Sequence, residues 1–232
     1  FDEPSDFDGF LKKELLSQMA TVNISKQEAI LSEAIFTRLK NIALIDKYEA
    51  YQLLDDSWLT IAGDLEMIQS EGFAASKQVD PYLVMKKQKG KEQEIQEGWV
   101  GHIMPFEWVQ KTYLNDELQR LQTNENRLNE ISADYDAILD SLSEEEKESE
   151  TIKETNDAFI NAVVIKTAKQ LRTDIKQNGA FAEDSYEAKI INVDQLITEE
   201  KKLKKDVKAE AEALHLLTKQ TIENLSDEQV HE

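Results

Sequence analysis

The scarcity of chain-breaking residues constrains this sequence more than any other feature. Its 232 residues include only 7 glycines and 3 prolines. A sheet-rich fold of this size needs many turns, and turns depend heavily on glycine and proline. We therefore expect a mainly α fold, with an N-terminal helical bundle, a small β-hairpin arm, and long helices that form an antiparallel, coiled-coil-like bundle.

The spacing of apolar residues divides the chain into three expected parts. Residues 1–80 have apolar residues at helical spacing and predict three helices, which could cross in an antiparallel or an orthogonal arrangement. The second of these helices starts at Ser25, where Glu28 completes a capping box. Residues 81–104 break the helical period and predict a β-hairpin or an irregular arm. Residues 105–232 predict a coiled-coil-like region of long helices.

A leucine-rich seam marks the first long helix, predicted from Pro105 to about Leu142. Counted in heptads from Leu114, the seam positions are apolar except for Glu125 and Ser132. The residues between the seam positions are mostly polar, which is the pattern of a coiled coil. The acidic run from Ser143 to Glu150 should then end this helix in a solvated turn.

Two further helices are expected, one over residues 151–178 and one from about Val193 to Leu225. The last helix has a looser seam, because Glu200 and Glu210 fall on it. We expect it to fold back on the first long helix as an antiparallel pair, although the seam could equally bind a partner protein. The candidate residues for such an interface are Leu114, Leu118, Leu121, Leu128, Tyr135, Leu203, Leu214 and Leu217.

The chain is strongly acidic, with 47 Asp and Glu residues against 27 Lys and Arg residues and a net charge of −20. Such a charge repels a phosphate backbone, so we expect protein partners, and DNA contact only through a complex. Lysines on the expected arm could touch phosphates if another subunit placed them beside DNA, although a solvated face is the commoner reason for such a cluster. These possible phosphate contacts are Lys86, Lys87, Lys89 and Lys91.

The absence of certain residues limits the kinds of site and location to consider. Cysteine is missing, which excludes disulfides and thiolate metal sites. No apolar run approaches the roughly 20 residues that span a bilayer, so we expect a soluble cytoplasmic protein without membrane contact. Because the chain begins at Phe1 rather than at a methionine, we expect it to be a piece of a longer polypeptide.

Catalytic and metal-binding patterns are weak throughout the sequence. Glu212 with His215, and Glu228 with His231, have the Glu-x-x-His spacing of di-iron ligands, but both pairs fall on one expected helix. His102 has no sequence neighbour that would orient it for acid–base catalysis. No glycine-rich phosphate loop is present. We therefore expect no catalytic residue, no bound cofactor and no metal in this chain.

Three segments follow one another along the first part of the chain. They are FDGFLKK from Phe7 to Lys13, ALIDKYEAYQLLDDSW from Ala43 to Trp58, and IMPFEWVQKTYL from Ile103 to Leu114. Together, in this order, they resemble the C-terminal region of the DNA-methylating subunit of type I restriction-modification enzymes. The resemblance extends over roughly the first 145 residues and becomes generic in the coiled-coil region that follows.

This resemblance implies a role in enzyme assembly. In such enzymes the region is helical and helps to attach two methylating subunits to the DNA-specificity subunit, while an upstream domain binds S-adenosylmethionine and methylates adenine N6. The Asn-Pro-Pro-aromatic motif and the glycine-rich loop of that domain are missing here, so no catalytic residue carries over. The chain would then be a non-catalytic part of a site-specific DNA N6-adenine methyltransferase. The alternative is an unrelated acidic coiled-coil scaffold or adaptor.

Overall fold

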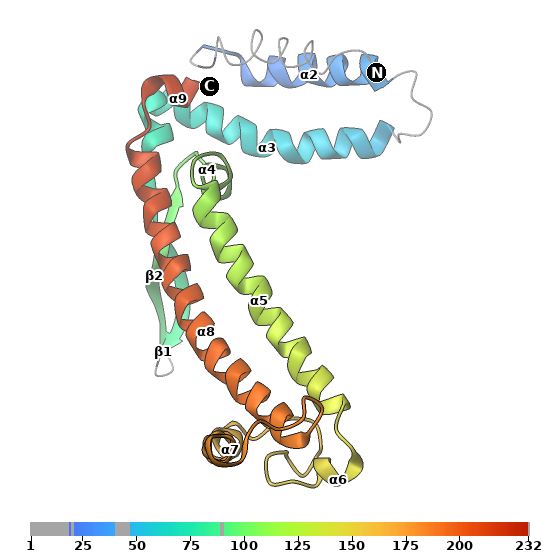
Figure 1. The fold of residues 1–232 in the computed structure, drawn as a ribbon. Coiled ribbons are helices and arrows are strands. Elements are labelled where there is room, and N and C mark those ends of the chain that lie inside the picture. The colour runs from blue at the N-terminus through green and yellow to red at the C-terminus, as the bar shows by residue number, and fades with distance from the viewer. Residues whose placement is uncertain (1–18, 20, 40–46, 89–90, 232) are drawn as a thin grey trace. The chain divides into compact units, whose positions relative to one another are not determined.

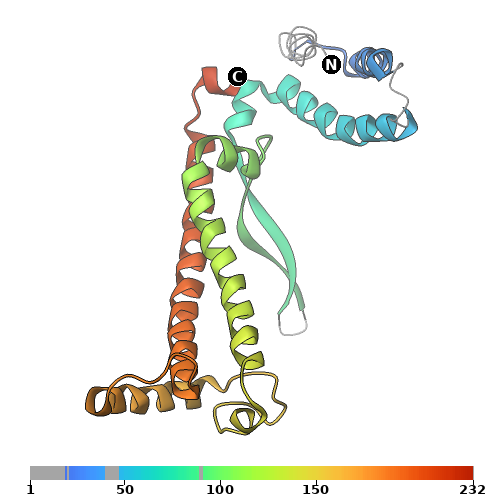
Figure 2. The ribbon, with the colours of Figure 1, turned by 45° about the vertical axis from the view of Figure 1, so that its right-hand side comes forward.

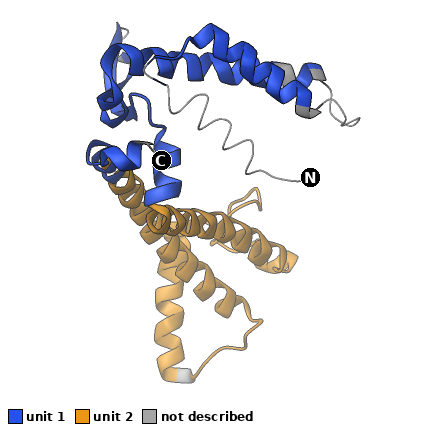
Figure 3. Ribbon diagram, turned by 90° about the horizontal axis from the view of Figure 1, so that it is seen from above, with its two compact units in different colours: residues 1–113, 217–232 blue, residues 114–216 orange. Residues whose placement is uncertain are grey.

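The computed structural model describes residue 19 and residues 21–39, 47–88 and 91–231. Within these residues the chain is mainly α-helical with one two-stranded antiparallel sheet, which confirms the predicted fold class (Figure 1 and Figure 2). The chain divides into two compact units, one formed by residues 1–113 with 217–232 and the other by residues 114–216 (Figure 3). The first predicted helix, and with it the FDGFLKK segment, lies outside the described residues.

In the first unit, α2 (Ile24–Leu39) and α3 (Lys47–Glu71) pack against each other around Trp58. The side-chain amide of Gln69, near the end of α3, donates a hydrogen bond at 2.9 Å to the carbonyl of Val22, just before α2. Because the start of α2 meets the end of α3, the two helices are antiparallel, as Figure 1 shows. Of the two crossings left open by the sequence, this pair adopts the antiparallel one.

The N-terminal cap of α2 differs from the predicted one. The backbone N–H of Lys26 donates to the Asn23 side-chain oxygen at 3.0 Å, so Asn23 caps the helix. Ser25 lies inside α2, and the capping box predicted for Ser25 and Glu28 is wrong. Asparagine is an equally good capping residue, and it comes directly before the first helical residue.

The predicted hairpin is confirmed. Strands β1 (Val79–Gln88) and β2 (Lys91–Gly101) pair antiparallel along their whole length. The register shifts after Tyr82, which pairs with Gly98, and Glu97 is the extra residue of a β-bulge. Gly98 has a φ of 153°, a conformation that glycine adopts far more easily than other residues. The additional twist at a bulge discourages pairing with strands of other molecules.

Residues 217–232, which follow in sequence after the whole second unit, belong to the first unit. The side-chain amide of Gln110, on α4 (Phe106–Tyr113), donates to the hydroxyl of the fully buried Thr218 at 3.1 Å. The Lys219 ammonium lies 4.6 Å from the ring centroid of Trp99 on β2, within the range of a cation–π contact. These contacts fix the C-terminal residues to α4 and to the hairpin.

The second unit is built on α5 (Asn115–Asp140) and the part of α8 (Tyr186–Glu223) that ends at Leu216. The two helices lie side by side and run antiparallel, which is the predicted arrangement (Figure 2). The short helix α6 (Glu144–Lys147) and the longer helix α7 (Asn161–Asn178) lie next to one end of the pair. The core at this end is formed by Leu139, Leu142, Ile152, Phe159, Val164, Ala168, Ile190, Val193 and Ile197.

The single helix predicted from Pro105 to Leu142 is wrong, because the chain forms two helices there. Leu114, with φ −127° and ψ 33°, leaves the helical conformation between α4 and α5. The new helix starts at Asn115 and carries Asp116 and Glu117 in its first turn. Carboxylates at that position favour a helix N-terminus, because they interact with its unpaired N–H groups.

The predicted starts of the two later helices are also wrong, whereas the predicted end of α7 at Asn178 is confirmed. α7 begins at Asn161 rather than at Thr151, because Asn156 has a positive φ of 55°, which interrupts a helix. An isolated bridge between Ile152 and Phe159 closes this loop instead. α8 begins at Tyr186, before the predicted start at Val193.

Candidate protein-interaction surface

Arg127 joins α5 to α8 near the middle of α5. Its Nε donates to Glu199 Oε1 at 2.8 Å, and its Nη2 donates to Glu199 Oε2 at 3.1 Å. Its Nη1 donates to Asp134 at 3.2 Å and to Glu130 at 3.3 Å. A two-pronged contact between a guanidinium and a carboxylate is geometrically specific, so it fixes how far one helix is shifted along the other.

The two glutamates that weaken the predicted seam have partners on the opposite helix. The Tyr135 hydroxyl donates to Glu200 Oε2 at 3.0 Å. The Asn124 side-chain amide donates to Glu210 Oε2 at 2.8 Å. Because both donors lie on α5 and both acceptors on α8, these polar pairs align the helices where the seam lacks apolar residues.

Hydrogen bonds along the helix pair, together with burial of Tyr135, shift the pKa values of four side chains. The hydrogen bonds from Arg127 lower the pKa of the Glu199 carboxyl, and in turn they raise the pKa of Arg127. The hydrogen bond from Lys204, assisted by the one from Tyr135, lowers the pKa of Glu200. Burial, followed by the hydrogen bond to Glu200, raises the pKa of Tyr135. At neutral pH both carboxylates are therefore ionised and the phenol remains a donor.

The structure places the eight predicted interface residues on α5, on α8 or at the residue before α5. Leu114, Leu121 and Leu214 are buried within the chain. The remaining five residues are half-buried: Leu118, Leu128, Tyr135, Leu203 and Leu217. The seam is thus covered in part inside the chain, while its half-buried residues retain surface that another helix can contact.

The most buried side chain of α5 is one that the heptad pattern does not select. Ile131 is only 1% exposed, whereas the seam positions Glu125 and Ser132 are exposed. The register counted from Leu114 is therefore wrong over this part of the helix. An apolar residue directly beside a polar seam position was the signal in the sequence that could have revealed it.

The lysines predicted as phosphate contacts lie on the hairpin. Lys86, Lys87 and Lys91 are exposed, and Lys89 lies outside the described residues. Lys86 forms an ion pair with Glu97 in the bulge of β2. The positive charge on the described part of the hairpin is therefore partly neutralised by glutamates of the same hairpin.

His102, considered above as a candidate catalytic residue, lies at the base of the hairpin between two carboxylates. Its Nδ1 is 2.6 Å from Asp80 Oδ2, and its Nε2 is 3.6 Å from Glu71 Oε2 at the end of α3. Its backbone N–H also donates to the Gln78 carbonyl at 3.0 Å. The hydrogen bond to Asp80 raises the pKa of His102, and the charge of Glu71 adds to the effect. His102 therefore joins β1 to α3, and protonation of its ring adds charge to both contacts.

Raising the pH should weaken this junction. Because the folded-state pKa of His102 lies above its ordinary value of 6.5, the charged form contributes stability that is complete below pH 6.5 and is lost as the pH rises through the folded-state pKa. His102→Gln should reduce the decline in the free energy of unfolding over that pH range. Urea denaturation at a series of pH values measures it, with His215→Gln in the other unit as the control. An unchanged pH dependence in His102→Gln would contradict the role of the imidazolium.

The part of the chain that the structure describes contains no candidate metal-binding site. No group of three or more His, Asp or Glu side chains there could hold a metal ion. Glu212 and His215 lie on α8, but Glu228 and His231 lie on α9 (Asp227–His231), so the prediction that both pairs share one helix is wrong.

The described residues thus offer helix surfaces, aligned by ion pairs, as the candidate functional site. Within the same residues, no helix is long and apolar enough to cross a membrane. Comparisons with protein-family models, curated proteins and solved structures found no match to this chain.

Proposed function

We propose that the chain is the non-catalytic C-terminal assembly region of the DNA-methylating subunit of a type I restriction-modification enzyme. The observation that carries this proposal is the order of the segments FDGFLKK, ALIDKYEAYQLLDDSW and IMPFEWVQKTYL along the chain. The parent protein would transfer a methyl group from S-adenosylmethionine to adenine N6 in DNA. This region would attach it to the DNA-specificity subunit in the cytoplasm.

The exposed face of α3, which contains most of the second segment, supports a role in partner binding. Tyr48 is 87% exposed and Leu59 is 72% exposed. Their separation of eleven residues corresponds to about three helical turns, which places both side chains on one face of α3. Large apolar side chains on a protein surface are typical of binding sites for other proteins.

The pair formed by α5 and α8 supports the same role. Its half-buried residues Leu118, Leu128 and Leu203 form part of a seam beside which a further long helix can pack. The specificity subunits of the enzymes that this chain resembles are themselves built around long helices. The net charge of −20 favours contact with DNA through such a partner rather than directly.

An unrelated acidic scaffold or adaptor is the second candidate function. The observation that favours it is the pairing of α5 with α8 through Arg127 and Tyr135, which satisfies much of the seam inside the chain. A scaffold would also bind proteins, but its partner would not be a DNA-specificity subunit. The identity of the partner therefore separates the two candidates.

The assembly role predicts a stoichiometric complex with the DNA-specificity subunit encoded in the same genome. Analytical ultracentrifugation measures the complex, and titration calorimetry measures its affinity. Replacing both Tyr48 and Leu59 with alanine should weaken binding by about tenfold or more, because the loss of two exposed anchors removes apolar contact area. The isolated chain should not bind S-adenosylmethionine in the same calorimeter.

The matched control makes the same replacement by alanine at Glu49 and Thr60. Each of these exposed residues follows a test position on α3 by one residue. Because one residue corresponds to a rotation of about 100° around a helix, these side chains lie on a different face and their loss should leave binding nearly unchanged. Absence of any complex, or calorimetric binding of S-adenosylmethionine to the chain, would overturn the proposal.

A further inference from the structure

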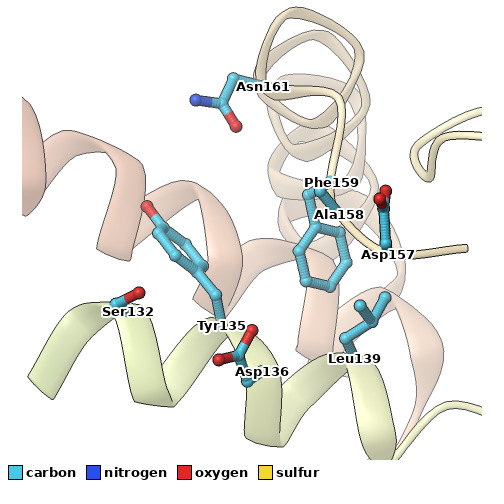
Figure 4. A pocket seen from close by; sticks show the side chains of 8 residues that line it. All are labelled: Ser132, Tyr135, Asp136, Leu139, Asp157, Ala158, Phe159 and Asn161. Carbon is cyan, nitrogen blue, oxygen red and sulfur yellow. The ribbon is translucent and has the colours of Figure 1, made fainter.

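A pocket of about 180 Å³ lies in the second unit, between α5 and the loop that leads into α7. Figure 4 shows that one side comes from α5 and the other from the loop and the first residue of α7. The space suits a single long side chain, since pockets for drug-sized ligands are typically about 300 Å³ or larger. Its lining residues are Ser132, Tyr135, Asp136, Leu139, Asp157, Ala158, Phe159 and Asn161.

Two aromatic rings form walls of this pocket and are held in place from outside it. The rings of Tyr135 and Phe159 have centroids 6.5 Å apart and planes inclined by 54°. The Tyr135 hydroxyl is fixed by its hydrogen bond to Glu200, and Phe159 is buried and bridged to Ile152. The walls are thus formed before any ligand arrives, so a ligand does not have to order them.

Carboxylates complete the lining. Asp157 accepts a hydrogen bond from the Thr155 hydroxyl at 2.6 Å, which positions it at the pocket. Asp136 is exposed and has no hydrogen-bond or ion-pair partner within the ranges that the structure describes. Ser132 and Asn161 add a hydroxyl and a side-chain amide. The pocket therefore combines aromatic faces with hydrogen-bond acceptors and negative charge.

The chain around the pocket strengthens the negative field. Between Glu130 and Ile160 the sequence has 11 carboxylates and 2 lysines, with no arginine. Such a concentration of one sign attracts cations and repels phosphates. It also disfavours a second copy of this acidic chain as the occupant.

We propose that this pocket receives an arginine side chain from a basic segment of a partner protein. A planar guanidinium can lie against an aromatic face while its N–H groups donate to carboxylate, hydroxyl and amide oxygens. The aromatic walls and the acceptors of this pocket offer both kinds of contact in a space of suitable size. The inference rests on the pocket alone and does not depend on the proposed restriction-modification role.

The first experiment compares two short peptides that differ in one group, which is the charged guanidinium of arginine or the neutral urea of citrulline. The ¹⁵N-labelled chain is titrated with acetyl-Gly-Arg-Gly-amide or with the same peptide containing citrulline, and amide shifts are followed by NMR. The arginine peptide should shift the amides of residues 132–139 and 157–161, with a Kd of about 1 mM, as befits a single side chain. The citrulline peptide should bind at least tenfold more weakly. Equal binding of the two, or no shifts at these amides up to 20-fold that Kd, would overturn the proposal.

The second experiment separates the pocket from the general charge of this region. Replacing Asp136 and Asp157 with asparagine should weaken binding of the arginine peptide at least fivefold. The control replaces Asp140 with asparagine and Glu154 with glutamine, which removes the same charge from exposed positions that do not line the pocket. The control should bind almost as well as the unaltered chain, and an equal loss in both variants would show non-specific attraction instead.

Discussion

Replacing Gly101 with alanine should lower the free energy of unfolding of the first unit by about 3 kcal/mol, because the new methyl group has no room. A Cβ built at Gly101 would lie 1.9 Å from the Met104 carbonyl oxygen and 3.0 Å from the carbonyl carbon. These are backbone atoms, so they can move only if the turn between the hairpin and α4 changes. That turn also carries His102, so the junction with α3 should weaken too.

The measurement is urea denaturation followed by tryptophan fluorescence. All three tryptophans, Trp58, Trp99 and Trp108, belong to the first unit, so their signal reports its unfolding alone. Gly63→Ala is the matched control, because a Cβ there meets nothing within 4 Å inside α3. That change should raise stability by about 0.5–1 kcal/mol, since alanine suits a helix interior better than glycine. Effects of the same sign in the two variants would contradict the geometry at Gly101.

Replacing Ile131 with aspartate should destabilise the second unit by about 4 kcal/mol or more. The change removes a large side chain that is 1% exposed and introduces a carboxylate in its place. The helix pair should then unfold at a lower temperature, which circular dichroism at 222 nm measures. The fluorescence of the first unit provides an internal reference in the same sample.

Ser132→Asp is the control, and it also tests the register of α5. Ser132 occupies a seam position if heptads are counted from Leu114, but it is exposed in the structure. The substitution should therefore change stability by less than about 0.5 kcal/mol, as is usual on a surface. A larger loss from Ser132→Asp than from Ile131→Asp would restore the heptad register and contradict the structure.

The predicted register was wrong because the heptads were counted from Leu114, which lies at a helix break and outside α5. The sequence makes Pro105 to Leu142 resemble one helix, while the backbone at Leu114 starts a new one. Beyond the break, burial follows the large apolar side chain of Ile131 rather than the seven-residue repeat. The helical structure of these segments and their antiparallel pairing were predictable. Both depend on the local spacing of apolar residues and on the scarcity of glycine and proline.

The polar contacts of the candidate surface lay beyond sequence reasoning for a different reason. Glu199 is 72 residues from Arg127, and Glu210 is 86 residues from Asn124, so their pairing depends on how far α8 is shifted along α5. The sequence shows Glu210 only as a defect of the seam. His102 is a similar case, because its neighbour Asp80 is brought close by the strand register.

The return of residues 217–232 to the first unit makes the second unit an insertion. Its entry and exit are close together, since Gln110 and Thr218, on either side of it, share a hydrogen bond. Seven residues added to α5 and seven to the facing part of α8 would lengthen the helix pair by about 10 Å and keep the alternation of its seam. Evolution can therefore adjust the reach of the paired helices without altering the fold of the unit that bears them.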